Sequence, residues 1–320
     1  MPAKVTAFSP TFASMSIKLL TNVLLTIGLS SALTSSAQDT LWISYGTWVQ
    51  ELDTMDALRF NPNDAFSSNN AVIDRPADSA SQLVLVNNDS LDHTLSLSGS
   101  ANDAASSWIG ANLPAGDTTA LDFPALSQGS YRYFLNGDRA HVLGAAGLLR
   151  VGFPAPGQPG NPGEPSDPAT TLLFNWNLCE WSPTRIATVT GPTPEQWTPP
   201  YIPKYFTINE RSYPATIEDP ATEVNLLLGQ TGIISVTNHG YMDQVVHFHG
   251  FHVTILYDTA TPQRQNWSKD TVPVRAGHTV TLELIADQLG TYPVHAHNLI
   301  AVTNAGFYPG GMLTLIQVTP

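Results

Sequence analysis

Short hydrophobic runs of alternating polarity, separated by Gly, Pro, Asn and Asp, dominate the chain from residue 40 onward. Typical runs are residues 81–86 (SQLVLV), 233–237 (IISVT), 252–256 (HVTIL) and 279–285 (TVTLELI). Residues two apart on a strand point to the same face, so a period of two predicts half-buried strands. Many such strands with turn residues between them are typical of sandwiches or barrels, and they predict an all-β protein.

One segment without this alternation divides the chain. Residues 153–170 (FPAPGQPGNPGEPSDPAT) contain six prolines and three glycines and offer almost nothing to bury. This composition predicts an extended linker. We therefore expect one β domain over residues 40–152 and a second over residues 171–320, each of a size typical of one antiparallel sandwich.

The two halves also resemble each other in sequence. Residues 81–99 align without a gap on residues 232–250, an offset of 151, and a second offset of 161 aligns residues 129–131 on residues 290–292. We interpret this as a duplicated β unit, with a chance similarity of turn chemistry as the alternative.

The first 37 residues predict an export signal. They contain Lys4 and Lys18 but no acid, an apolar stretch at residues 19–29 (LLTNVLLTIGL) and a small-residue exit that ends at Ala37. This pattern predicts a secretory signal peptide over residues 1–37, with Met15 as a plausible start. A membrane anchor is the alternative, but the apolar stretch is shorter than the roughly 20 residues that span a bilayer. We expect a secreted or periplasmic protein without a membrane partner.

Charge and cysteine content exclude two classes of function. The chain has 13 basic and 26 acidic side chains, for a formal net charge of −13. A nucleic-acid partner is not expected, because binding phosphates needs a basic face. Cys179 is the single cysteine, so no internal disulfide and no cysteine-built zinc knuckle or iron–sulfur site can form, and we expect a buried, inert thiol.

Two His-x-His pairs, His247 with His249 and His295 with His297, are the strongest chemical signal. Two histidines at i and i+2 on a strand share one face, so four imidazoles converge if the two strands are neighbours. Neutral imidazole suits copper, zinc and nickel, and several imidazoles without a thiolate fit one type of copper site well. The alternative is that they are ordinary strand histidines, hydrogen-bonded at a sheet surface. We expect no metal at the other five histidines.

These motifs resemble those of the multicopper oxidase family, which is built from cupredoxin domains. Residues 247–250 (HFHG) resemble that family's His-x-His-Gly, and residues 290–297 (GTYPVHAH) its Gly-Thr-aromatic-x-x-His-Cys-His. Residues 311–312 resemble its closing Gly-Met. The resemblance covers most of residues 40–320 and is strongest over residues 205–318.

The resemblance implies two tandem cupredoxin-like Greek-key β-sandwiches, similar to two-domain laccases and copper nitrite reductases, which assemble as trimers. A homotrimer is therefore an expectation here. It also implies copper as the cofactor, held at positions that match the family's type 2 and type 3 ligands. Those positions are His247, His249, His295 and His297. Three nearby side chains are candidates for orienting these ligands: Asp243, Gln244 and Asn298.

The chain also departs from the family pattern at several ligand positions. The thiolate and the two histidines of the family's blue copper site fall on Ala296, Gln244 and Ala301, and only Met312 keeps a ligand side chain. A blue copper centre depends on a Cys–Cu bond, so none is expected. In the first half, the cluster ligands are also replaced. Those positions hold Ser96, Ser98, Phe134 and Asn136.

Two functions remain open from the sequence. One is a copper oxidoreductase that receives electrons directly from a small-molecule substrate or an external donor. The alternative is a non-catalytic copper-binding or scaffold module, since fold resemblance alone does not decide function.

Overall fold

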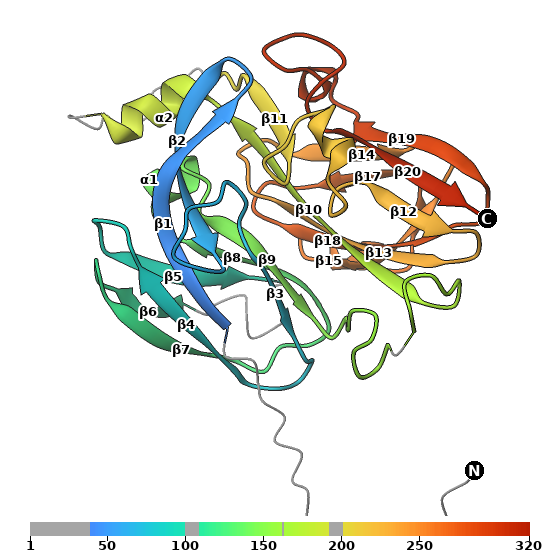
Figure 1. Ribbon diagram of the computed structural model, residues 1–320, viewed down its shortest axis with the longest axis horizontal. Coiled ribbons are helices and arrows are strands. Elements are labelled where there is room, and N and C mark those ends of the chain that lie inside the picture. The colour runs from blue at the N-terminus through green and yellow to red at the C-terminus, as the bar shows by residue number, and fades with distance from the viewer. Residues whose placement is uncertain (1–38, 100–108, 162, 192–200) are drawn as a thin grey trace, which may run out of the picture. The chain divides into compact units, whose positions relative to one another are not determined.

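In a computed structural model of the chain, which describes residues 39–99, 109–161, 163–191 and 201–320, the strands form four sheets (Figure 1). The prediction of an all-β protein is confirmed. The predicted signal peptide, residues 1–37, lies outside the described residues. Among the described residues, no helix combines the length and the apolar character needed to cross a bilayer.

The first sandwich consists of a four-stranded sheet, in the order β2-β1-β4-β7, and a five-stranded sheet, in the order β3-β9-β8-β5-β6. The strands are β1 (Asp39–Gln50), β2 (Asp53–Asn61), β3 (Val72–Arg75), β4 (Ser81–Asn87), β5 (His93–Ser98), β6 (Ile109–Leu113), β7 (Thr118–Phe123), β8 (Gly129–Leu135) and β9 (Ala146–Val151). A short helix, α1 (Asp138–Val142), connects β8 to β9.

The second sandwich consists of a six-stranded sheet, β11-β10-β13-β18-β15-β16, and a five-stranded sheet, β12-β20-β19-β14-β17. The strands are β10 (Thr171–Trp181), β11 (Tyr205–Ile208), β12 (Val224–Leu227), β13 (Thr231–Asn238), β14 (Gln244–Phe248), β15 (Val253–Asp258), β16 (Ser268–Lys269), β17 (Thr271–Val274), β18 (Thr279–Ile285), β19 (Gly290–Ala296) and β20 (Leu313–Thr319). Its other elements are α2 (Pro183–Thr190) and the 3-10 helices η2 (Ala215–Glu218), η3 (Pro262–Arg264) and η4 (Leu299–Val302).

The alternating runs become strands because one side chain in two enters a core. In β4, Leu83 and Leu85 are buried while the side chains between them are partly exposed, and β20 alternates in the same way. Two separate apolar cores result, one in each sandwich. Trp176 is a fully buried side chain at the centre of the second core, where its ring stacks on Phe248 with 5.9 Å between centroids.

The long strand β10 links the two cores. Its first half pairs in parallel with β13 inside the second sandwich, whereas Cys179 and Trp181 at its end belong to the first core. Helix α2 follows, N-capped by the hydroxyl of Ser182, and places Ile186 and Val189 in the first core too. A domain boundary at residue 171 stays a prediction. Some residues after it, such as Trp181 and Ile186, belong to the core of the first sandwich.

The predicted linker carries no helix and no ladder strand in its described residues, 153–161 and 163–170, apart from one isolated bridge between Gln158 and Asn161. It is nevertheless fixed to the second sandwich. The Gln230 amide donates hydrogen bonds to the carbonyls of Pro165 and Asp167, at 2.9 and 3.0 Å. The described residues of this segment run through successive backbone turns, and Gln230 attaches them to the second sandwich at Pro165 and Asp167.

The pairing registers support the proposed duplication. In the first sandwich Ser96 pairs with Phe134, and in the second His247 pairs with His295. The first members of these pairs differ by the 151-residue offset and the second members by the 161-residue offset. The two offsets found in the sequence therefore connect one paired position in the first sandwich with one paired position in the second.

Equivalent asparagines repeat the same hydrogen bonds in each half. The Asn87 amide nitrogen donates to the carbonyls of Leu91 and Leu113, both at 2.9 Å. The amide of Asn238 donates likewise to Met242 and Val274, at 2.8 and 3.0 Å. Each side-chain oxygen also accepts from the backbone N–H two residues on. Both asparagines are buried, so the backbone groups of each turn depend on this side chain for their hydrogen bonds.

We predict that Asn87→Ala and Asn238→Ala each lower the free energy of unfolding by roughly 2–4 kcal/mol, because buried backbone groups lose their partners. Urea denaturation measures the change. Asn112→Ala, at an exposed position, is the control and should change stability by less than about 0.5 kcal/mol. Equal effects of the buried and exposed replacements would contradict the structural role of this turn.

Candidate metal centre

The four motif histidines lie on the outer face of one sheet. Strands β14 and β19 pair antiparallel, with His247 opposite His295. Their neighbours Val246, Phe248 and Ala296 are buried in the second core, so the alternating imidazoles face the other way. His249 and His297 each follow the end of a strand and continue the ladder through backbone N–H bonds, at 3.0 and 2.7 Å.

Gly250 directly follows His249, two residues after β14 ends at Phe248. Its φ is +77°, in the left-handed region, and a Cβ there would come within 2.5 Å of the Tyr292 ring. Glycine is therefore the residue that both turns the chain and fits against Tyr292. This explains in physical terms why the motif reads His-x-His-Gly.

The rings form cross-strand neighbours. In an antiparallel pair, residues directly opposite and residues on one diagonal approach closely. Ring centroids are 5.7 Å apart for His247 and His295, 5.1 Å for His249 and His295, and 5.7 Å for His247 and His297. The sequence prediction that two His-x-His strands bring four imidazoles together thus agrees with this geometry.

Backbone carbonyls set the tautomers of the two central histidines. The Nδ1 atom of His247 lies 3.1 Å from the Asp270 carbonyl, and the Nδ1 atom of His295 lies 2.9 Å from the Ala296 carbonyl. A carbonyl only accepts hydrogen bonds, so each Nδ1 carries the proton and donates it. The Nε2 atom of each neutral ring then keeps its lone pair, which is the form that binds a metal.

One pair of nitrogens already has the separation of two ligands on one ion. The Nε2 atoms of His249 and His295 are 3.0 Å apart. Two nitrogens at about 2.0 Å from a shared ion, roughly at a right angle, also lie about 3 Å apart. Without an ion, His249 must donate its Nε2 proton to His295, so binding a metal here would release that proton.

One of the four rings has a perturbed pKa. Burial, together with the neighbouring rings of His247 and His295, lowers the pKa of His249. These surroundings disfavour the charged form of the His249 ring and so favour the neutral form, which is the one that binds a cation.

The ligand set is open in the described part of the chain. No three His, Cys, Asp or Glu side chains there are arranged as a finished cage around one ion. The described geometry instead offers two diagonal pairs, His249 with His295 and His247 with His297. Each pair would supply two nitrogens, and the remaining positions on an ion would face outward.

The three side chains expected to orient the ligands contact other groups instead of the histidine rings. Asp243 accepts a hydrogen bond from the Ala276 N–H, and the Gln244 amide lies 3.5 Å from Glu180. Asn298 accepts from the Ile300 N–H and caps η4. Their orienting role therefore stays a prediction.

Thr271 is the orienting side chain that the sequence did not reveal. Its Oγ1 atom lies 3.0 Å from Nδ1 of His247, and it pairs with His247 across β14 and β17. Thr271 sits in an ordinary strand run, TVPV, and only the register between strands identifies it.

The equivalent place in the first sandwich carries no imidazole. Phe134 pairs with Ser96, whose hydroxyl accepts a hydrogen bond from the Asn136 amide at 2.8 Å. His93, on the same strand, is buried and lies 2.8 Å from the Asp89 carboxylate, so it serves the structure. The equivalent pairs of strands in the two sandwiches thus carry different side chains, with imidazoles in the second sandwich alone.

Three positions that the sequence resemblance assigns to a blue copper site lie in the second core. Ala296, Ala301 and Met312 are all buried in the second core, and backbone hydrogen bonds connect Ala296 to Met312 and Met312 to Ala301. Cys179 is a free cysteine inside the protein, and its burial raises the pKa of the thiol. The expectation of a buried, inert thiol is confirmed for its burial.

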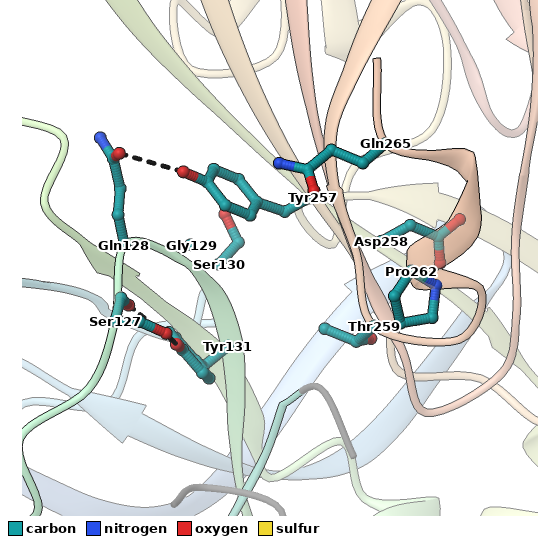
Figure 2. A pocket seen from close by; sticks show the side chains of 10 residues that line it. All are labelled: Ser127, Gln128, Gly129, Ser130, Tyr131, Tyr257, Asp258, Thr259, Pro262 and Gln265. Carbon is teal, nitrogen blue, oxygen red and sulfur yellow. Dashed lines mark hydrogen bonds between the residues drawn. The ribbon is translucent and has the colours of Figure 1, made fainter. Parts of the chain in front are cut away.

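A pocket of about 430 Å³ lies elsewhere, between the two sandwiches (Figure 2). In Figure 2 the Gln128 and Tyr257 side chains point toward each other across it, and the Tyr257 hydroxyl donates a 3.0 Å hydrogen bond to Gln128. The Thr281 hydroxyl donates to the hydroxyl of Ser130, a lining residue, and Ser130 donates to Ser235, so polar side chains join the two sandwiches here. None of the four motif histidines lines this pocket.

Comparison with known proteins places the fold. Residues 185–309 match the model of the multicopper oxidase family. A comparison with curated proteins gave no match. Among solved structures, the blue copper oxidase from Nitrosomonas europaea is similar over 87% of this chain and 85% of its own, with 21% identity and a TM-score of 0.68.

Two further structures show the same fold. The multicopper oxidase mgLAC is 22% identical, with 88% of this chain and 86% of the other covered and a TM-score of 0.68. The copper nitrite reductase from Nitrosomonas europaea is 16% identical, with 88% and 93% covered and a TM-score of 0.62. Copper is the cofactor that the family match implies. Residues 185–309 thus match the multicopper oxidase family model, and the chain has the two-sandwich, cupredoxin-like fold that these multicopper oxidase and copper nitrite reductase structures share.

Proposed function

We propose that this protein is exported, binds one or two copper ions through His247, His249, His295 and His297, and acts as an oxidoreductase without a blue copper centre. The observation that carries the proposal is the set of cross-strand imidazoles with Nε2 lone pairs on an open sheet face. The family match supports copper as the metal.

The donor set fits copper. All four side chains are imidazoles, and neutral imidazole is a good ligand for both copper oxidation states. Bound copper would supply one-electron chemistry between its cuprous and cupric forms. A thiolate is missing from the site, so electrons must come directly from a small-molecule substrate or an external donor. The exposure of His249 and His297 allows such direct access.

Copper-loaded protein should contain one or two copper ions per chain, show a type 2 electron-spin signal and lack intense blue absorption. The double variant His247→Ala/His295→Ala should lose this copper, because it removes one nitrogen from each diagonal pair. Metal analysis after dialysis against a weak chelator measures retention.

His252→Ala is the matched control, because His252 is an exposed histidine near the same motif but outside the four-ring group. It should retain copper at the wild-type level. Retention of copper by the double variant would show that the ligands lie elsewhere.

Thr271→Val should weaken copper binding by about 10–100-fold, the usual effect of removing a side chain that orients a metal-binding histidine. Competition with a chelator of known affinity measures it. Thr271→Ser keeps the hydroxyl and should restore most of the affinity. If valine and serine behave alike, the hydroxyl does not orient His247.

The second candidate is a non-catalytic copper-binding or scaffold module. It is favoured by the open ligand set and by the loss of imidazoles at the equivalent ladder of the first sandwich. Oxygen consumption with phenols, reducing metal ions and other reductants separates the two. Stoichiometric copper without oxygen consumption would establish the non-catalytic function.

Export and assembly belong to the same proposal. The pattern of residues 1–37 supports cleavage near Ala37 and a secreted or periplasmic location, which N-terminal sequencing of the mature protein tests. Leu299, Phe307 and Tyr308 expose 77%, 76% and 73% of their surfaces after the second His-x-His, which supports burial in a homotrimer. Analytical ultracentrifugation would show three chain masses.

A further inference from the structure

The pocket of about 430 Å³ between the two sandwiches has one wall that the first sandwich holds in place (Figure 2). This wall is the segment that leads into β8. There the Tyr131 hydroxyl donates a hydrogen bond of 2.8 Å to the Ser127 carbonyl. The Gln128 amide donates to the carbonyl of Gly152, also at 2.8 Å. Side chains of the wall therefore fix its backbone to the rest of the first sandwich.

The opposite wall, from the second sandwich, is held by a buried carboxylate. Asp258 ends β15, and its Oδ1 atom accepts hydrogen bonds from the N–H groups of Ala260 and Thr261, at 3.0 and 2.9 Å. Its Oδ2 atom forms an ion pair with Arg264. These contacts hold the turn that contains η3 and leads to Gln265, so the chain's own bonds define this wall.

Hydrogen bonds between the sandwiches set the distance between the two walls. The Tyr257 hydroxyl donates to Oε1 of Gln128 at 3.0 Å, and the Thr279 hydroxyl donates to the Ser130 carbonyl at 2.6 Å. The rings of Tyr257 and Phe153 pack at 73° to each other, with centroids 6.1 Å apart. The pocket is therefore preorganised, and a ligand would not have to order its walls.

Several polar groups of the lining are accessible to a small molecule. Ser127, Gln128 and Gln265 are exposed, and Tyr257 and Thr259 are partly exposed. In Figure 2 the Gln265 side chain points from its wall toward Tyr257 and Gln128. No side chain or backbone group of the described residues bonds to the Gln265 carboxamide, so its oxygen and its nitrogen are both unused.

The lining carries no net charge. Asp258 is the one carboxylate among the described residues that line the pocket, and Arg264 neutralises it. The Asp258 side chain also has no exposed surface, so it does not meet a ligand. None of these lining residues is Lys, Arg or His. A charged ligand would lose hydration here without gaining an opposite charge, so the pocket favours a neutral one.

Accessible amides and hydroxyls beside an aromatic ring match the chemistry of a sugar. Sugar hydroxyls both donate and accept hydrogen bonds, and the C–H faces of a sugar ring pack against aromatic rings. A carboxamide has an acceptor and a donor side by side, so it bonds two neighbouring hydroxyls at once. The pocket volume lies in the range of small-molecule sites, and sites of this kind often occur between domains.

We propose that this pocket binds a neutral saccharide, with the Gln265 carboxamide bonded to two adjacent hydroxyls and a sugar ring close to Tyr257. Ser127 supplies a further acceptor. Because the one hydroxyl proton of Tyr131 goes to the Ser127 carbonyl, the Ser127 hydroxyl is the donor in its 3.2 Å bond to the Tyr131 oxygen. The Ser127 oxygen then keeps lone pairs for a sugar hydroxyl.

Saturation-transfer NMR and titration calorimetry of the full chain with cellobiose, maltose, lactose and sucrose test the proposal. At least one of these neutral disaccharides should bind saturably. Its affinity should change less than about twofold between roughly 20 and 500 mM sodium chloride, because salt screens only charged contacts. Absence of saturable binding for all four sugars, or binding that salt abolishes, would overturn the proposal.

Two matched glutamines test the position of the site. Gln265→Ala should weaken binding of the same sugar about tenfold, because it removes two hydrogen bonds. Gln263→Ala is the control, since Gln263 is an exposed residue of η3 outside the lining, and it should keep the affinity within about twofold. Both positions are exposed, so both variants should keep the wild-type melting temperature. Unchanged binding by Gln265→Ala would contradict the assigned site.

A third variant separates this site from the proposed copper centre. None of the four motif histidines lines the pocket, so His247→Ala/His295→Ala should bind the sugar as wild type does, whatever its copper content. Loss of sugar binding in that variant, with an unchanged melting temperature, would place the sugar at the histidines and overturn the proposal.

Discussion

The pairing of β14 with β19 is the constraint on which the candidate metal centre depends. Because side chains alternate between faces, a slip of one residue would send the imidazoles into the core and the apolar side chains into water. Burial of Val246, Phe248 and Ala296 prevents that slip. The same hydrophobic packing that stabilises the second sandwich thus holds His247 opposite His295. The positions of these imidazoles along the strands therefore follow from the packing of the core.

Much of this arrangement could be predicted from the sequence, but only where spacing alone decides. Two His-x-His runs on strands fix which face the imidazoles share, and the 151- and 161-residue offsets anticipate matching ladders. Thr271 could not be found in this way, because its contact with His247 depends on the register of a third strand.

The duplicated ladders show how one scaffold can carry unlike chemistry. Asn87 and Asn238 make matching hydrogen bonds, so the turns beside the two ladders are held alike. The side chains on the outer faces nevertheless differ, with Ser96 and Phe134 in the first half and His247 and His295 in the second. Outward-facing positions contribute little to core packing, so they can exchange donors without endangering the fold.

The crossing of β10 from one core to the other limits the independence that duplication normally confers. Trp181 and Ile186 follow the Pro-rich segment in the chain yet fill the sandwich that precedes it. A fragment ending at residue 170 would lack side chains that fill the first core. The complementary fragment would expose the apolar face of α2, because the core that this helix packs against would be missing. The two halves therefore form one folding unit, because a single cut anywhere between residues 170 and 205 would take core side chains away from one sandwich or the other.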